Sequence, residues 1–240
     1  MTFCDLHTHV LHGVDDGAEN LSVALEMLKN AVCSDVQALA LTPHFLLERE
    51  EDLEQLALFR SAYDELTREA RELKVDLYLG AEVAVTSYLF ESGGDLPLPT
   101  LNGSRYLLTE FPFYFPEKAY ERVLVSLLEG GFVPIVAHPE RYEAVLRNPS
   151  LAREFVEAGA HLQLTAQSLT GAFGRRIKAL SHHLLEQDLV CCVASDAHDT
   201  RRRSNFLMEA YDSLRLGFSP EYANVLMWEN PMRILNDQDL

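Results

Sequence analysis

The sequence has few basic residues: 20 Lys and Arg stand against 37 Asp and Glu, which gives a formal net charge of −17. Extended contact with nucleic acid needs many Lys and Arg to replace counterions, so this composition argues against a nucleic-acid partner. No run approaches the roughly twenty apolar residues of a membrane span. The first ten residues, MTFCDLHTHV, lack the basic and apolar regions of a secretory signal. We therefore expect a cytoplasmic protein that does not insert into a membrane.

Cysteines are also few, and none of the four forms a C-x-x-C pair: Cys4, Cys33, Cys191 and Cys192. We expect free thiols whose ordinary role is core packing. No cysteine is followed six positions later by arginine, and neither G-x-S-x-G nor G-x-x-x-x-G-K-[ST] occurs. These absences argue against a cysteine-dependent phosphatase, a hydrolase with a nucleophile elbow and a P-loop enzyme.

Short apolar runs alternate with longer segments in which apolar residues recur every three or four positions. This alternation predicts an α/β fold with a parallel sheet, either open or closed into a barrel. No linker or composition shift divides residues 1–240, so we expect one domain, in which 91–102 is the most loop-like connection. The predicted strands are FCDL, VQALALT, DLYLGA, RYLLTEF, FVPIVA, HLQLT and LVCCVAS, and the predicted helices are Leu21–Val32, Asp52–Leu73, Lys118–Glu129, Ser150–Glu157, Gly174–Glu186, Arg203–Leu216 and Glu221–Trp228.

Six of the seven predicted strands run into a residue of a metal-ligand type. Because the carboxyl ends of parallel strands share one face, we expect these side chains to lie together. The two histidines of HTH are two positions apart and point to the same side of an extended chain, as do Asp and His in DAH. One such residue is more often an ordinary polar strand end, but six are hard to attribute to coincidence. The candidates are His7, His9, His44, Glu82, Glu110, His138, Asp196 and His198.

The stretch DLHTHVLHGVDDG adds one more carboxylate to these candidates. Gly17 permits a sharp turn that would fold Asp16, or Asp15 in its place, back to the strand ends. His12 falls outside the register and is expected in the loop. Imidazoles and carboxylates without thiolates suit Mn²⁺, Fe²⁺ or Zn²⁺. Nine candidate ligands are too many for one ion, and two or three ions sharing a carboxylate suit phosphate-ester hydrolysis.

Arginines beside such a site would bind phosphate oxygens. Arg141 follows His138 by three residues, and a run of three arginines follows His198. Within that run we favour Arg203 over Arg202. The aromatic stretch 113–115 follows Glu110 and could stack on a phosphotyrosine ring, with core packing as the alternative.

HTH with a following DDG, TPH, GAE, TEFPF, AHPERY and ASDAH, in that order, resemble the polymerase-and-histidinol-phosphatase (PHP) superfamily. Within it, the chain is most similar to the bacterial manganese-dependent protein tyrosine phosphatases of capsule and exopolysaccharide regulation. The resemblance covers most of the chain and implies a distorted seven-stranded, TIM-like β/α barrel with three metal ions at its carboxyl rim. Manganese is the implied metal, with Fe²⁺, Zn²⁺ or Mg²⁺ as alternatives.

The resemblance also implies roles for the individual residues. His7, His9, Glu82 and Asp196 would hold the first ion; Glu82, Glu110 and His138 the second, with Glu82 bridging; Asp16, His44 and His198 the third. Arg141 and Arg203 match positions that bind the substrate phosphate, and a hydroxide between the metals would be the nucleophile. The implied substrate is phosphotyrosine in the tail of a bacterial tyrosine autokinase. Some relatives place basic residues directly after the second-strand histidine, whereas this chain has HFLLERE there.

Two other interpretations stay open. One is a histidinol-phosphatase-like phosphomonoesterase for a small metabolite. The other is a non-catalytic metal-binding module, against which the completeness of the ligand set argues. A PHP nuclease is disfavoured by the negative charge of the chain.

Overall fold

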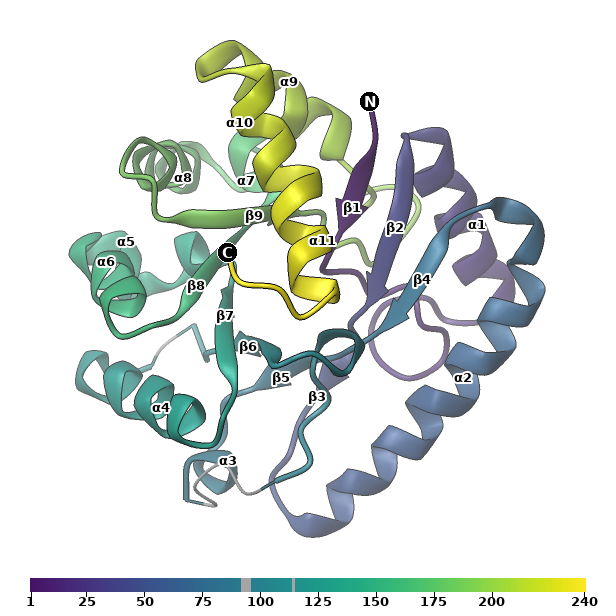
Figure 1. Ribbon diagram of the computed structural model, residues 1–240, viewed down its shortest axis with the longest axis horizontal. Helices are drawn as coiled ribbons and strands as arrows, with labels where there is room; N and C mark the ends of the chain where they lie inside the picture. The colour runs from purple at the N-terminus through teal and green to yellow at the C-terminus, as the bar shows by residue number, and fades with distance from the viewer. Residues whose placement is uncertain (92–95, 114) are drawn as a thin grey trace.

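A computed structural model describes residues 1–91, 96–113 and 115–240 of the protein. Helices surround a set of parallel strands (Figure 1). In these ranges no helix is both long and apolar enough to cross a membrane. The strands are β1 (Phe3–Asp5), β2 (Val36–Leu41), β3 (His44–Phe45), β4 (Asp76–Leu79), β5 (Glu82–Ala84), β6 (Tyr106–Glu110), β7 (Val133–Ala137), β8 (His161–Thr165) and β9 (Val190–Ala194). The helices are α1 (Leu21–Cys33), α2 (Gln55–Glu69), α3 (Ser87–Glu91), α4 (Glu117–Glu129), α5 (Glu143–Arg147), α6 (Ser150–Glu157), α7 (Ala166–Thr170), α8 (Arg175–Glu186), α9 (Leu207–Gly217), α10 (Pro220–Asn224) and α11 (Asn230–Leu235).

The strands form two sheets, with orders β1-β2-β4 and β3-β5-β6-β7-β8-β9, and each pair is parallel. The prediction of a parallel α/β fold is therefore confirmed. A single closed seven-stranded sheet is not what the described residues form. Pro43, which has no N–H to donate, separates β2 from β3. The 3₁₀ turn η3 (Leu101–Gly103) contacts both β4 and β6, which are not paired with each other.

The apolar core has two parts, which the alternation of side chains along the strands separates. In β2, Leu39 and Leu41 pack outward against the helices, whereas Ala38 and Ala40 join the inner cluster. Helix α11 contributes Ile234 and Leu235 to this inner cluster and contacts β1 and β9 (Figure 1). The inner side of the strands is therefore filled with apolar side chains, and polar inward positions remain for the carboxyl ends.

Several predicted helices need correction at their ends. The predicted helix 52–73 is α2 flanked by the 3₁₀ turns η1 (Glu50–Glu54) and η2 (Arg71–Leu73). The helix expected from Arg203 begins only at Leu207, because the backbone carbonyl of Arg203 accepts the His198 N–H at 2.7 Å and keeps that segment at the strand ends. The predicted helix 221–228 is α10 followed by a π turn, η5 (Val225–Glu229). The short helices α3, α5, α7 and α11 were not predicted, since five or six residues carry too little periodicity.

Two further expectations can be compared with the structure. Cys4, Cys191 and Cys192 are buried, but Cys33 ends α1 and is exposed, so its assignment to the core is wrong. In the expected loop 91–102, residues 96–100 have no helix or strand, whereas residue 91 ends α3 and residues 101–102 belong to η3; residues 92–95 lie outside the described ranges.

Candidate metal centre

The carboxyl ends of the strands bring the nine candidate ligands together. In β6, Tyr106 and Leu108 belong to the inner cluster, and the alternation places Glu110 on the same side. Cys192 and Ala194 of β9 point inward in the same way and lead to Asp196. The local backbone also departs from strand geometry, because His138 (φ 34°) and Asp196 (φ 54°) are left-handed. Such conformations are uncommon outside glycine and gather at functional sites.

Glu82 lies at the centre of the cluster and is 1% exposed. Its Oε2 is 3.2 Å from His7 Nε2, 3.4 Å from His9 Nε2 and 3.0 Å from His44 Nδ1. Its Oε1 is 2.9 Å from His138 Nε2. Glu110 extends this group, with carboxylate oxygens 3.6 Å from His138 Nε2 and 3.9 Å from His44 Nδ1. One buried carboxylate thus contacts four imidazoles, as a bridging ligand would.

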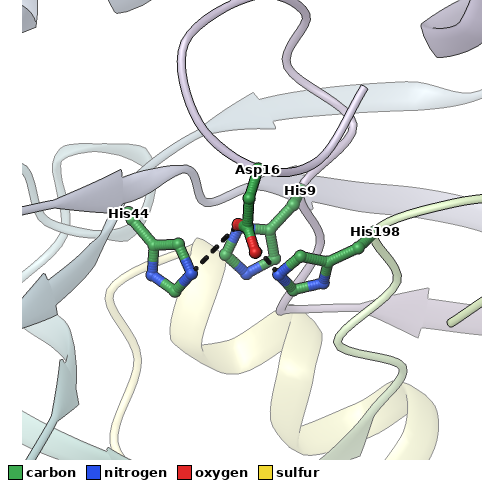
Figure 2. Close-up of side chains that lie close together, drawn as sticks. All are labelled: His9, Asp16, His44 and His198. Atoms are coloured by element: carbon green, nitrogen blue, oxygen red, sulfur yellow. Dashed lines mark ion pairs between the residues drawn. The ribbon is translucent and has the colours of Figure 1, made fainter. Parts of the chain in front are cut away.

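A second group lies on the outer side of the cluster, where His9, Asp16, His44 and His198 face one another from three segments of the chain (Figure 2). Asp16 Oδ1 is 3.4 Å from Nε2 of both His44 and His198. The rings of His9 and His198 stack with their centroids 3.7 Å apart. One donor atom from each of the four lies within 4.8 Å of the others.

The structure distinguishes Asp15 from Asp16. Asp16 faces the histidines, whereas Asp15 Oδ2 accepts from His9 Nδ1 at 2.7 Å and from the His44 backbone N–H at 3.1 Å. The loop that carries both passes so close to His9 that a Cβ on Gly17 would lie 2.0 Å from the His9 carbonyl oxygen. Gly17 is thus needed for close approach of two backbones. His12 lies in the loop, as predicted, and contacts Glu65.

The electrostatics of the cluster favour cations. Burial lowers the pKa of His7, but the carboxylates of Glu82 and Asp196 outweigh it and raise the pKa to about 10. Burial also opposes protonation of His44, yet Glu82, Glu110 and Asp16 raise its pKa to about 9. Burial and the neighbouring His9 lower the pKa of His198 to about 4, which keeps that ring neutral. Protons therefore compete with metal ions at His7 and His44.

The hydrogen bonds of the cluster fit a bound metal. Nδ1 of His7 contacts Gln163 Oε1 at 3.0 Å and Nδ1 of His9 contacts Asp15, so in the neutral rings both Nδ1 atoms are the donors. The two Nε2 lone pairs then face each other at 3.1 Å, an arrangement that a shared cation stabilises. Glu82 Oε2 and His198 Nε2 are also buried, and among the described residues their contacts with His44 at 3.0 Å and Asp16 at 3.4 Å do not have hydrogen-bond geometry. Imidazoles and carboxylates in this arrangement suit divalent transition metals.

Both predicted arginines lie at the edge of this cluster. Arg141 Nη1 is 2.8 Å from Asp196 Oδ2, and Arg203 Nη2 is 3.0 Å from Asp196 Oδ1. The side chain of Arg202 is exposed, and its backbone carbonyl accepts from Gln167 at 2.7 Å. Of the two alternatives in the arginine run, Arg203 is the one whose side chain reaches the site.

Aromatic rings enclose Arg141. The guanidinium carbon lies 5.2 Å from the centroid of Phe113 and 5.0 Å from that of Phe173. Of the predicted aromatic stretch, Phe113 is thus at the site, Phe115 packs on Phe111, and residue 114 lies outside the described ranges.

Sequence reasoning missed two residues that position the site. Gln163 points inward from β8 and contacts His7, and inward alternation in HLQLT was the signal that could have found it. Glu140, in the turn η4 (Pro139–Arg141), accepts from the Thr165 N–H at 3.0 Å and from Ser168 Oγ at 2.6 Å. These bonds fix the turn that carries Arg141, and no pattern in the local sequence predicts them.

Known proteins resemble this chain over most of its length. Residues 3–236 match the family described as capsular polysaccharide synthesis, CpsB/CapC. The chain belongs to this family. Its members include CapC of Staphylococcus aureus, 36% identical over 215 residues that span 88% of this chain and 83% of CapC. The tyrosine-protein phosphatase YwqE of Bacillus subtilis is 33% identical over 238 residues, which span 98% of this chain and 92% of YwqE.

A solved structure of the family has the same fold. Described as one of the crystal structures of YwqE from Bacillus subtilis and CpsB from Streptococcus pneumoniae, unique metal-dependent tyrosine phosphatases, it superposes with a TM-score of 0.88 at 32% identity. The superposition covers 99% of this chain and 96% of that one. The resemblance to PHP-type tyrosine phosphatases is thus confirmed at the level of the family.

The role of Asp15 can be tested apart from the ligands. Because Asp15 holds the His9 ring and the His44 backbone, we expect Asp15→Asn to weaken metal binding by about 10- to 100-fold, as loss of such outer partners does. Titration of the metal-free protein with Mn²⁺ measures this affinity. The exposed Asp64 of α2 supplies the matched control Asp64→Asn, which should bind as the wild type does. Equal affinity in both variants would contradict a positioning role for Asp15.

Proposed function

We propose that this protein is a metal-dependent protein tyrosine phosphatase, a phosphoric monoester hydrolase that acts on phosphotyrosine in a protein. The observation that carries the proposal is a cluster of four carboxylates and five imidazoles beside two arginines. Membership of the CpsB/CapC family supports phosphotyrosine as the reacting group. The family description, capsular polysaccharide synthesis, supports a role in that process, and we propose the tail of a bacterial tyrosine autokinase of capsule or exopolysaccharide synthesis as the substrate.

The cluster is proposed to hold up to three divalent ions, in the first place Mn²⁺, with Fe²⁺, Zn²⁺ and Mg²⁺ as alternatives. Such ions stabilise charge on phosphoryl oxygens and lower the pKa of water. The proposed ligands are His7, His9, Glu82 and Asp196 for one ion, Glu82, Glu110 and His138 for another, and Asp16, His44 and His198 for the third. The close groups of donor atoms support this division in part, and they also bring His9 to the third group.

The residues of the chain itself would bind and orient the phosphate. Four carboxylates repel a phosphate dianion, so positive charge must be supplied at their edge. Arg141 and Arg203 converge there from two sides, and Asp196 contacts both guanidinium groups. Phe113 and Phe173 cover the guanidinium group of Arg141 and hold it in place. Paired N–H donors of this kind match phosphate oxygens.

Replacing Arg141 tests this role. We expect Arg141→Ala to lower kcat/KM for a phosphotyrosine peptide by about 10²-fold, since a charge-assisted contact to the reacting group is lost. Metal content, measured by mass spectrometry, should stay that of the wild type. The control is Arg147→Ala, because Arg147 is 63% exposed and pairs only weakly with Glu143. Wild-type kinetics in Arg141→Ala would remove this residue from the site.

The proposed function as a whole is tested by metal removal. Protein treated with a chelator should lose turnover of a phosphotyrosine peptide and regain it with Mn²⁺, with Fe²⁺, Zn²⁺ and Mg²⁺ added separately for comparison. Histidinol phosphate, assayed in parallel, should be hydrolysed more slowly. If histidinol phosphate is the better substrate, the tyrosine assignment is wrong while the metal chemistry stands. If metal-loaded protein hydrolyses neither, the protein is not this phosphatase.

We also infer that residues 1–240 form one domain in which the two sheets act as one distorted ring of seven strand positions. β2 and β3 then count as one strand position of the ring, and β4 and β5 count as another. The Gly80 N–H donates to the Leu41 carbonyl and the Glu82 N–H donates to the Pro43 carbonyl, so the hydrogen bonds between these two positions continue past the ends of β2 and β4. The bridge between Thr8 and Ala197 supports closure between β1 and β9.

A further inference from the structure

Negative charge is unevenly distributed along this chain. Residues 158–185, which are 28 positions, contain no Asp or Glu, although the whole chain has 37 such residues in 240. This stretch contains Arg175, Arg176 and Lys178. A second acid-free stretch, 200–208, contains the three consecutive arginines 201–203.

The structure brings both stretches to the edge of the metal cluster. Helix α7 follows β8 at its carboxyl end, and the segment with the three arginines follows β9, which pairs with β8. The bond from Gln167 of α7 to the Arg202 carbonyl joins the two stretches. Phe173, two residues before Arg175, lies against the guanidinium group of Arg141. The two basic stretches therefore flank the arginine that is proposed to bind phosphate.

Five basic side chains of these stretches are exposed and unpaired. In the part of the chain that the structure describes, none of them has a carboxylate within 4.0 Å. Asp199 is the acid nearest in sequence to Arg201 and Arg202. Its carboxylate accepts the backbone N–H groups of residues 201–203 and does not pair with the side chains of Arg201 and Arg202. We call these five side chains the basic rim: Arg175, Arg176, Lys178, Arg201 and Arg202.

The segment after β3 has the opposite character. It reads LLEREED, and Glu48, Glu50 and Glu51 are exposed. Arg49 in this segment already contacts Asp52 at 3.5 Å. An acidic polypeptide would be repelled on this side of the site and attracted to the basic rim.

We propose that the basic rim binds acidic side chains next to the phosphotyrosine in the substrate polypeptide, and this inference rests on the proposed function. The phosphate enters at Arg141, and the flanking acidic residues lie along α8 and the arginine segment 201–203. Contacts between exposed charges mainly raise the rate at which the enzyme and its substrate associate, and salt screens them. The rim therefore selects among phosphotyrosine sequences without taking part in the chemical step.

Three substrates separate these effects: a phosphotyrosine peptide with acidic flanks, the same peptide with Gln in place of its acids, and p-nitrophenyl phosphate. In the double variant Arg175→Gln/Arg176→Gln we expect kcat/KM for the acidic peptide to fall about 3- to 10-fold at low salt. The Gln peptide and p-nitrophenyl phosphate should react as with the wild type. The preference of the wild type for the acidic peptide should disappear in 0.5 M NaCl, roughly where the Debye length is below 5 Å.

A matched control removes two exposed charges elsewhere, Lys29→Gln/Arg71→Gln, in α1 and in the turn after α2. This control should keep the preference for the acidic peptide. Equal losses of kcat/KM for the acidic and Gln peptides in the rim variant would contradict binding of acidic side chains by the basic rim. A loss in the control as large as in the rim variant would contradict it as well. A wild type that hydrolyses none of the three substrates would overturn the proposed function itself, and the rim with it.

Discussion

Replacing Glu82 by Gln should lower kcat/KM for a phosphotyrosine peptide by about 10³-fold or more, because metal-dependent charge stabilisation is worth several kcal/mol. Glu82 is buried, and its two oxygens contact four imidazoles from three strand ends. Burial alone would raise the pKa of this carboxyl, but His7, His138 and His44 hold it well below its usual range. The side chain is therefore an anion in the folded protein. An amide of the same shape removes that charge and leaves only one oxygen as a ligand.

Two measurements on Glu82→Gln separate loss of the site from loss of the fold. Metal content per chain should fall below that of the wild type, while circular dichroism should keep the wild-type helix signal. The control is Glu186→Gln at an exposed position near the end of α8, which should leave metal content and turnover unchanged. A Glu82→Gln protein that retains its metal and its turnover would show that this carboxylate does not bridge the ions.

The second large effect is expected from the smallest change, Gly17→Ala. An added Cβ would lie 2.0 Å from the His9 carbonyl oxygen and 2.5 Å from the His9 Cβ. Both are atoms of a buried segment, so the loop has to move. We expect overpacking to cost about 2–3 kcal/mol, which for a chain of this length lowers Tm by roughly 5–10 °C. Because the displaced loop carries Asp15 and Asp16, turnover should also fall, by about 10²-fold for a shift near 1 Å.

A second glycine-to-alanine substitution controls for the general effect of an added methyl group. At Gly217, at the end of α9, no atom lies within 4 Å of the position a Cβ would take, and its φ is not positive. Gly217→Ala should therefore leave Tm and kcat/KM close to those of the wild type. If Gly17→Ala behaved like Gly217→Ala in both measurements, the close contact between the loop and His9 would not be needed for the site.

The fold class and the ligand types could be predicted from local patterns. Continuous apolar runs between segments of helical period give parallel strands covered by helices, and that pattern depends only on neighbouring residues. The HTH and DAH spacings place their side chains on one side of an extended chain, and both pairs do meet at the cluster. Predictions of burial at the end of a helix also require the tertiary position of that end, which local patterns do not contain. Cys33 has the helical pattern of a core residue, yet it is exposed because α1 ends there.

The sequence by itself thus determined the parallel α/β class, the excess of negative charge and the set of metal-ligand side chains, because these follow from composition and from periods of two to four residues. Tertiary structure alone decided which of two adjacent aspartates faces the histidines and which of the arginines 202 and 203 reaches Asp196. Adjacent residues of one type are equivalent in sequence, and they become different only through contacts with residues far along the chain. The same holds for Gln163 and Glu140, whose partners lie 156 and 25 or more positions away.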